Sequence, residues 1–460
     1  MDQTLVFDPE IIRRYDCSGP RYTSYPTAVQ FHEGFRADRY CEVARASNET
    51  TRPLSLYFHL PFCDTVCFYC ACNKVVTKDR TRSGPYLERL HREIRLQGAL
   101  FDRSRVVTQL HWGGGTPTFL SHGEMQALME ETRHHFTLLE DGSGEYAIEI
   151  DPREAQVDTI ALLRSLGFTR ISLGVQDFDT RVQQAVNRIQ TEKETTIVLE
   201  AARSQGFGSI SVDLIYGLPF QSVKSFGTTL EKILAVRPDR ISLFNYAHLP
   251  DLFPPQRRIR AEDLPSPAEK LAILHSSIDH LTAAGYLYIG MDHFAMPGDE
   301  LARAQREGTL HRNFQGYSTQ ANVDLIGLGS TAISQVGSTY SQNARDLEHY
   351  YTRLGENELP LFRGIELNED DRIRREVITQ LICHFRLDYA AVAREYGIQC
   401  ADYFSQEISE LAILENDGLI ALSPIGIQVQ PRGKLLIRNI CMVFDRYLRS
   451  QTQRRFSKVI

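Results

Sequence analysis

The sequence predicts an α/β protein with a partial (β/α)6 barrel, an N-terminal arm before it and a mainly helical, winged-helix-like C-terminal domain. Short β-rich runs alternate with helix-length amphipathic segments between residues 54 and 246, and unusual polar or glycine-rich motifs follow the runs. This alternation is typical of parallel strands joined by right-handed crossovers. With 42% hydrophobic and 24% charged residues, the chain can bury a sizeable core.

Six runs are expected as barrel strands, and amphipathic segments between them as helices. The strands are predicted at 54–60, 106–112, 146–150, 170–175, 209–216 and 239–246, and the helices around 86–98, 122–136, 154–166, 193–205 and 222–236. A helix around 266–284 and a strand within 286–294 are expected to extend the barrel. In parallel barrels the functional residues gather at the carboxyl ends of the strands.

We divide the chain into an irregular N-terminal arm (1–50), the barrel with its extension (51–365) and the C-terminal domain (366–460). The segment GLIALSPIGIQVQPRG (418–433) predicts a two-stranded wing. It has no dominant basic stripe, so we expect a structural or lid role for this domain, not DNA binding.

Charge and hydropathy limit the partners of this chain. The 58 acidic residues outnumber the 51 Lys and Arg, which gives a net charge of −7 and argues against a nucleic-acid-binding protein. Apolar stretches of about nine residues are far shorter than the roughly 20 needed to cross a bilayer. The start MDQTLVFDPE has neither a basic region nor an apolar core, so we expect a cytoplasmic protein. We also expect a monomer.

Four of the nine cysteines lie within ten residues, as Cys63-Asp-Thr-Val-Cys67-Phe-Tyr-Cys70-Ala-Cys72. Three thiolates on one loop can hold three irons of a [4Fe–4S] cube and leave the fourth iron open. Structural zinc usually takes two ligand pairs, and no second pair follows, so zinc is the weaker interpretation. Cys72 follows Cys70 too closely to bind another corner of the cube without strain, and its role stays open. The scattered five cysteines are expected as buried hydrophobes.

The spacing C-x3-C-x2-C, with Tyr69 before the third cysteine, resembles the signature of radical S-adenosylmethionine (SAM) enzymes. The segment GGGTPT (113–118) supports this, since consecutive glycines after a strand let the backbone approach a ligand closely. Further motifs in order resemble the oxygen-independent coproporphyrinogen III oxidase family: RYTSYPT, EIDPRE, GVQDF, DLIYGLP, FNYAHLP, MDHFA, HRNFQGYST and FSKVI.

The resemblance implies oxidative decarboxylation of two propionates of coproporphyrinogen III to vinyl groups, giving protoporphyrinogen IX in haem biosynthesis. A 5′-deoxyadenosyl radical would take a hydrogen from each propionate. The cofactors would be a [4Fe–4S] cluster, with three cysteine ligands and the fourth iron open for SAM, and two SAM molecules. The partners would be an electron donor of the flavodoxin or ferredoxin type and an electron acceptor that the sequence does not identify.

By the same resemblance, Cys63, Cys67 and Cys70 are the cluster ligands. Positions that match SAM-lining residues of the family are Tyr57, Tyr69, Gly114, Gly115, Thr116, Glu149, Gln176, Arg188, Asp213, Ala247 and Ile333.

Arginines must hold the four propionates of the substrate because the protein as a whole is acidic, and arginine pairs with carboxylates in a bidentate manner. Arg21 and Arg312 are the candidates, whereas the run Arg257, Arg258 and Arg260 is expected to be solvated surface cations. The alternatives are a related haem chaperone that keeps the cluster but does not decarboxylate, and another radical SAM reaction such as a methylation.

Overall fold

The computed structural model describes residues 4–449, so the FSKVI motif (456–460) lies outside the described residues. Packing divides the chain into two compact units. The barrel unit contains residues 31–273 and 322–366, and the C-terminal unit contains the described residues of 1–30, 274–321 and 367–460. The domain boundaries at 50 and 365 stay predictions, although packing groups residues 274–321 with the C-terminal residues.

The predicted alternation of strands and helices is confirmed in the barrel unit, because all six runs are parallel strands. They are β1 (Leu54–Leu60), β4 (Val106–Gly114), β6 (Glu145–Ile150), β7 (Arg170–Gln176), β8 (Ser209–Tyr216) and β9 (Arg240–Asn245), in the order β9-β8-β7-β6-β4-β1. Leu56, Ile148 and Val212, from three of these strands, are fully buried and belong to the core.

The sheet continues beyond β1 in a way that the sequence did not predict. Strand β14 (Asp324–Leu328) pairs with β1 as a further parallel strand. Strands β15 (Ile333–Val336), β16 (Thr339–Asn343) and β17 (Leu361–Glu366) then follow in antiparallel order. The short run DLIGL carries no alternation that would set it apart from a loop.

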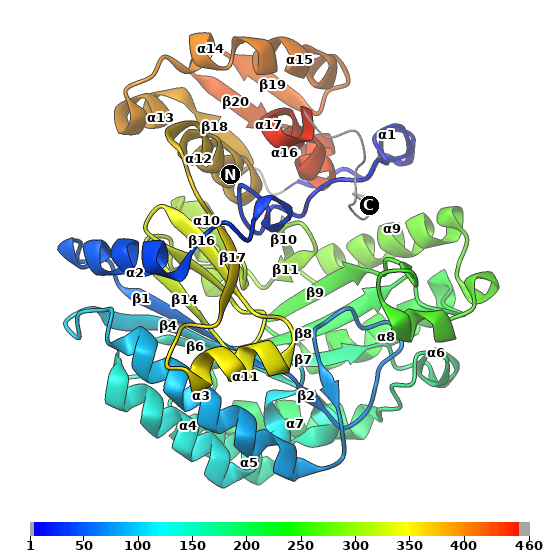
Figure 1. The fold of residues 1–460 in the computed structure, drawn as a ribbon. Helices are drawn as coiled ribbons and strands as arrows, with labels where there is room; N and C mark the ends of the chain where they lie inside the picture. Colours follow the sequence, from blue (N-terminus) through cyan, green and yellow to red (C-terminus); the bar gives the residue numbers. More distant parts are fainter. Residues whose placement is uncertain (1–3, 450–460) are drawn as a thin grey trace. The chain divides into compact units, whose positions relative to one another are not determined.

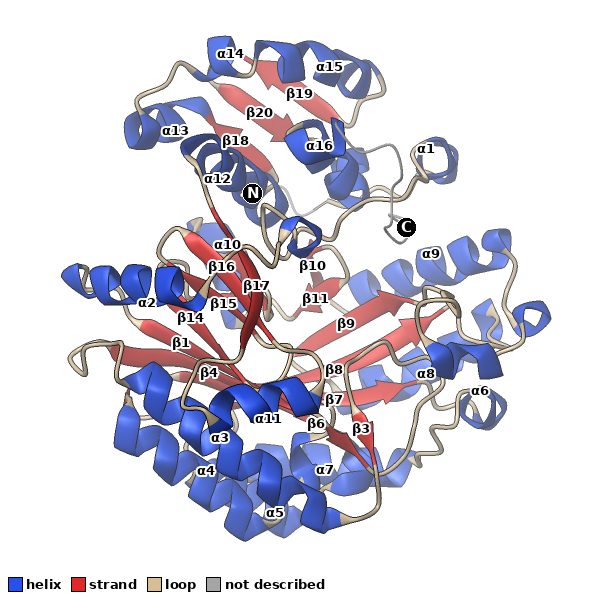
Figure 2. Cartoon of the chain, in the orientation of Figure 1, coloured by secondary structure: helices blue, strands red, loops and turns tan. Residues whose placement is uncertain are grey.

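Helices α3 (Ser83–Gly98), α4 (His122–His135), α5 (Val157–Ser165) and α7 (Glu192–Ser204) cover one face of this sheet (Figures 1 and 2). Helix α8 (Val223–Val236) follows β8 and buries Phe226, Leu230 and Ile233. Capping boxes begin α4, α7 and α8, because the side chain of Ser121, Thr191 or Ser222 accepts a hydrogen bond from the third residue of its helix. The local sequence therefore determines where these three helices begin.

Shorter elements complete the barrel unit: β2 (Phe62–Cys63), β3 (Val75–Val76), β5 (Thr137–Leu138), α2 (Ala37–Ala46), α6 (Thr180–Ala185) and α11 (Leu347–Gly355). The first fifty residues were predicted to be irregular, but they contain helix α1 (Pro9–Arg14) and helix α2. Asp8 caps α1 by accepting from the amides of Glu10 and Ile11, a local signal that the sequence analysis missed.

The C-terminal unit confirms the mainly helical prediction and its wing. Strands β19 (Ile420–Ser423) and β20 (Gly426–Val429) form the hairpin, and β18 (Arg386–Asp388) adds a third strand. The helices are α12 (Glu369–His384), α13 (Tyr389–Tyr396), α14 (Cys400–Tyr403), α15 (Ser405–Asn416), α16 (Ile437–Val443) and α17 (Arg446–Arg449). No helix within residues 4–449 is long and apolar enough to span a bilayer.

Residues 274–321 contribute α10 (Glu300–Glu307) and two hairpins, β10 (Leu287–Gly290) with β11 (His293–Ala295) and β12 (His311–Asn313) with β13 (Gly316–Ser318). Helix α9 (Pro267–Ala283) and strand β10 match the helix and strand predicted for 266–284 and 286–294.

Candidate active site

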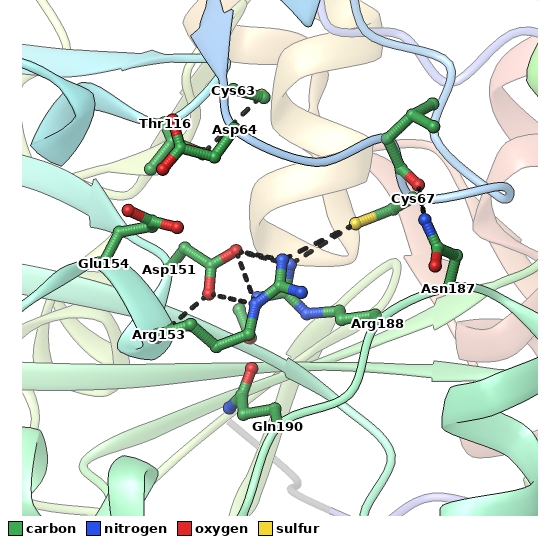
Figure 3. A network of polar contacts seen from close by, with 12 residues as sticks. Cys63, Asp64, Cys67, Thr116, Asp151, Arg153, Glu154, Asn187, Arg188 and Gln190 are labelled. Carbon is green, nitrogen blue, oxygen red and sulfur yellow. Dashed lines mark hydrogen bonds and ion pairs between the residues drawn. The ribbon is translucent and has the colours of Figure 1, made fainter. Parts of the chain in front are cut away.

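The cysteine loop is held at both ends and near its middle. Strand β2 ends at Cys63 and pairs with β3 beyond the loop, and the Thr77 amide donates to the Cys63 carbonyl at 2.9 Å. In the middle, the Asn187 side-chain amide donates to the Val66 carbonyl at 2.8 Å (Figure 3). The Phe68 amide donates to the Val186 carbonyl at 2.9 Å. These contacts place the thiols beside the carboxyl ends of the barrel strands.

A pocket lies at these strand ends. Its lining includes eleven of the predicted site residues: Cys63, Cys67, Tyr69, Cys70, Gly114, Gly115, Thr116, Glu149, Gln176, Arg188 and Asp213. Cys72 also lines it. Their roles as ligands or contacts stay predictions, but residues from five strand ends meet in one place.

Three predicted residues of the barrel unit are not among the lining residues. The Tyr57 ring stacks on His111 with ring centroids 5.8 Å apart, and its hydroxyl lies 3.3 Å from His59 Nδ1. Ala247 follows β9, and Ile333 begins β15, and both are partly buried. Arg21 and Arg312 belong to the C-terminal unit.

The glycine segment lies too close to its neighbours for any side chain. A Cβ atom at Gly113 would lie 2.9 Å from the Glu149 carboxyl carbon, and one at Gly115 would lie 2.6 Å from the Phe62 carbonyl oxygen. Gly114 has φ of +108°, a backbone conformation that glycine adopts without a steric penalty. The segment therefore presents bare backbone to the pocket.

Two carboxylates of the pocket differ in their protonation behaviour. Burial would raise the pKa of Glu149, but a hydrogen bond from His111 at 3.2 Å and one from the Gly114 amide lower it below its usual value. Burial raises the pKa of Asp213 to about 6, although the Ser172 hydroxyl donates to it at 3.0 Å. Glu149 is thus an anionic acceptor, as a ribose hydroxyl or an ammonium group would require.

The thiols have different surroundings. Burial raises the pKa of Cys63 to about 11, and the Thr116 hydroxyl lies 3.6 Å from its sulfur. Contact with the Cys72 thiol lowers the pKa of Cys70. The sulfur of Cys67 lies 3.6 Å from a guanidinium nitrogen of Arg188. A second guanidinium, that of Arg153, lies near it too, and sequence analysis did not single this residue out although the motif EIDPRE contained it.

The donor set fits the implied cofactors. Three soft thiols on one loop suit an iron–sulfur cluster, and exposed glycine backbone beside an anionic carboxylate suits the amino acid and ribose groups of SAM. Residues 4–449 contain no group of three or more His, Cys, Asp or Glu side chains placed to hold a single metal ion.

Comparison with known proteins supports the same assignment. Residues 57–233 match the model of the radical SAM superfamily, and residues 367–436 match that of the HemN C-terminal domain. Oxygen-independent coproporphyrinogen III oxidase of Pseudomonas aeruginosa is 56% identical over 460 residues, which is 100% of both chains. The enzyme of the same name from Escherichia coli K12 is 50% identical over 100% of this chain and 99% of its own.

A solved structure agrees with the fold as well. Coproporphyrinogen III oxidase (HemN) from Escherichia coli, described as a radical SAM enzyme, superposes with a TM-score of 0.92 at 48% identity and covers 96% of this chain and 100% of its own. The α/β barrel with its helical C-terminal domain is thereby confirmed. The chain belongs to the oxygen-independent coproporphyrinogen III oxidase family within the radical SAM superfamily.

Proposed function

We propose that this protein converts two propionate side chains of coproporphyrinogen III to vinyl groups without oxygen, giving protoporphyrinogen IX. The observation that carries the proposal is the pocket that gathers Cys63, Cys67 and Cys70 with the glycine segment and Glu149. Full-length identity of 50–56% to enzymes of that name supports the substrate.

In this proposal the three cysteines hold a [4Fe–4S] cluster whose fourth iron is open to SAM. When bound, the cluster and SAM supply the 5′-deoxyadenosyl radical that takes a hydrogen from the substrate propionate. Gly114 and Gly115 leave room for the amino acid part of SAM, and Glu149 accepts hydrogen bonds from the ribose hydroxyls of SAM. Arg188 is buried and Tyr69 is partly buried in the pocket wall, which limits the access of water and protects a reactive radical.

We retain two SAM molecules per chain in the proposal. Eight of the residues that match SAM-contacting positions of the family line the pocket, whereas Tyr57, Ala247 and Ile333, which also match such positions, are not among the lining residues. We assign Tyr57, Ala247 and Ile333 to contacts with a second SAM molecule. Binding stoichiometry of SAM on the iron-loaded protein, measured by equilibrium dialysis, tests this number.

Arg312 is the stronger of the two candidates for holding a propionate. The residue is 9% exposed, and its Nε and one terminal nitrogen have no hydrogen-bond partner in the described part of the chain. Its guanidinium lies 4.8 Å from the centre of the Tyr317 ring. A buried charge without a counterion is costly, so a carboxylate ligand would stabilise it.

Arg21 already has a partner, because it donates to Asp292 at 2.6 Å. Arg312→Met should therefore weaken binding of coproporphyrin III, the oxidised form of the substrate, more than Arg21→Met does. Arg303→Met, on the exposed side of α10, is the control and should leave the affinity unchanged. Equal affinity of Arg312→Met and wild type would remove Arg312 from the proposal.

The proposal further includes a cytoplasmic monomer, an electron donor of the flavodoxin or ferredoxin type and a separate electron acceptor. No nucleic acid or membrane takes part.

Product analysis tests the proposed function. Reduced, iron-loaded protein with SAM, coproporphyrinogen III and an added one-electron acceptor under anaerobic conditions should yield protoporphyrinogen IX and 5′-deoxyadenosine. Stoichiometric haem binding without vinyl products would favour the chaperone alternative, and S-adenosylhomocysteine would indicate a methyl transfer.

A further inference from the structure

We propose that Arg153 is a positioning residue that holds positive charge against the sulfur of Cys67 and raises the reduction potential of the cluster. The inference rests on the proposed function only in that Cys67 binds a cluster. Arg153 lies just after β6, in the short helix η5 (Pro152–Glu154) of the EIDPRE motif.

Arg153 is fixed by a carboxylate on the same turn. Its Nε donates to Asp151 Oδ1 at 3.0 Å, and a terminal nitrogen donates to Asp151 Oδ2 at 2.7 Å, so the pair is bidentate. That same terminal nitrogen lies 3.9 Å from the sulfur of Cys67. The guanidinium therefore has one orientation, and this orientation faces the thiol (Figure 3).

Asp151 also binds the second arginine. Arg188 donates to Asp151 Oδ2 at 2.8 Å and approaches the Cys67 sulfur at 3.6 Å. Two guanidinium groups and one carboxylate leave a net charge of +1 beside this sulfur. The sulfur of Cys63, by contrast, contacts a neutral group, the Thr116 hydroxyl.

Little water can screen this charge. The side chains of Asp151 and Arg188 are each 8% exposed, and that of Arg153 is 18% exposed. Electrostatic interactions are stronger at such sites than in water. The pKa of Asp151 is lowered, because its arginine partners outweigh the effect of burial, so the carboxylate keeps its charge and its hold on both groups.

The consequence concerns the electron that the cluster accepts. Reduction makes a cluster more negative, and hydrogen bonds and positive charge at its sulfur ligands stabilise the reduced form. Arg153 therefore favours reduction by the donor, without touching SAM or substrate itself. Its shared contact with Asp151 also keeps Arg188 in place.

The test compares reduction potentials of iron-loaded variants by redox titration monitored by electron paramagnetic resonance. Arg153→Met should lower the equilibrium constant for reduction about tenfold, a shift of about 59 mV to more negative potential for one electron. Arg153→Lys, which keeps the charge, should shift it less. Arg95→Met is the control, because Arg95 pairs with Glu131 on the surface, and it should not shift the potential.

An Arg153→Met protein with full iron content and an unchanged potential would overturn the inference. If that variant does not retain iron, Arg153→Gln is titrated in its place. A shift to more negative potential then supports the inference, and an unchanged potential overturns it. Failure of wild type to hold any cluster would contradict the proposed function, whereas a full cluster without a shift contradicts only the role of Arg153.

Discussion

Gly115 offers a sharp test of how the glycine segment supports the cluster loop. In Gly115→Ala the added Cβ would lie 2.6 Å from the Phe62 carbonyl oxygen, 2.7 Å from the Pro61 carbonyl carbon and 2.9 Å from the Leu60 carbonyl oxygen. All three are backbone atoms, which cannot rotate away as a flexible side chain can. The Gly115 amide also donates to the Leu60 carbonyl at 2.9 Å, so the two segments cannot separate without losing that bond.

Overpacking of this kind costs about 1–3 kcal/mol, which corresponds to roughly a 5- to 150-fold rise in the population with a displaced loop. Because Cys63 follows Phe62 directly, we expect Gly115→Ala to lose iron and to melt at a lower temperature. Iron per chain and thermal melting measure both effects.

Gly123→Ala is the matched control. Gly123 lies in the first turn of α4, and nothing lies within 4 Å of its added Cβ. Alanine there should stabilise the helix by about 0.5–1 kcal/mol and leave iron content unchanged. Gly115→Ala protein with wild-type iron content and melting temperature would refute the steric argument.

Three further predictions concern the cluster, SAM and pH. Cys70→Ser should abolish the absorption of the cluster, whereas Cys72→Ser should retain it; unchanged iron in Cys70→Ser would contradict the ligand assignment. Glu149→Gln should weaken SAM binding about 10- to 150-fold by calorimetry, because a hydrogen bond to a charged group contributes about 1.5–3 kcal/mol, and equal affinity would remove Glu149 from the site. Burial raises the pKa of Glu93 from 4.5 to about 7, so the folded chain binds this proton more tightly than the unfolded chain and loses stability as pH rises through that interval. The melting-temperature advantage of wild type over Glu93→Gln should therefore shrink between pH 5 and pH 7, and a constant difference would contradict it.

The sequence predicted features whose signal is local. The six barrel strands are short apolar runs between amphipathic helices. The cysteine spacing that predicts an iron–sulfur cluster lies within ten residues. Strand β14 was missed because its five residues become a strand only by pairing with β1, more than 260 residues earlier.

The electrostatics of the site could not be predicted from the sequence in the same way. Asp151 and Arg153 follow β6, whereas Arg188 follows α6, so these three residues meet Cys67 only in the folded chain. Likewise, two guanidinium nitrogens of the buried Arg312 have no hydrogen-bond partner among the described residues, whereas Arg21 pairs with Asp292, and no sequence pattern distinguished the two.

The most direct test of the proposed function is the ratio of products in a single anaerobic incubation. We predict two molecules of 5′-deoxyadenosine and two of carbon dioxide for each protoporphyrinogen IX formed, with none of these products from the Cys70→Ser variant. Cleavage of SAM in the presence of coproporphyrinogen III without loss of carbon dioxide would contradict the proposal.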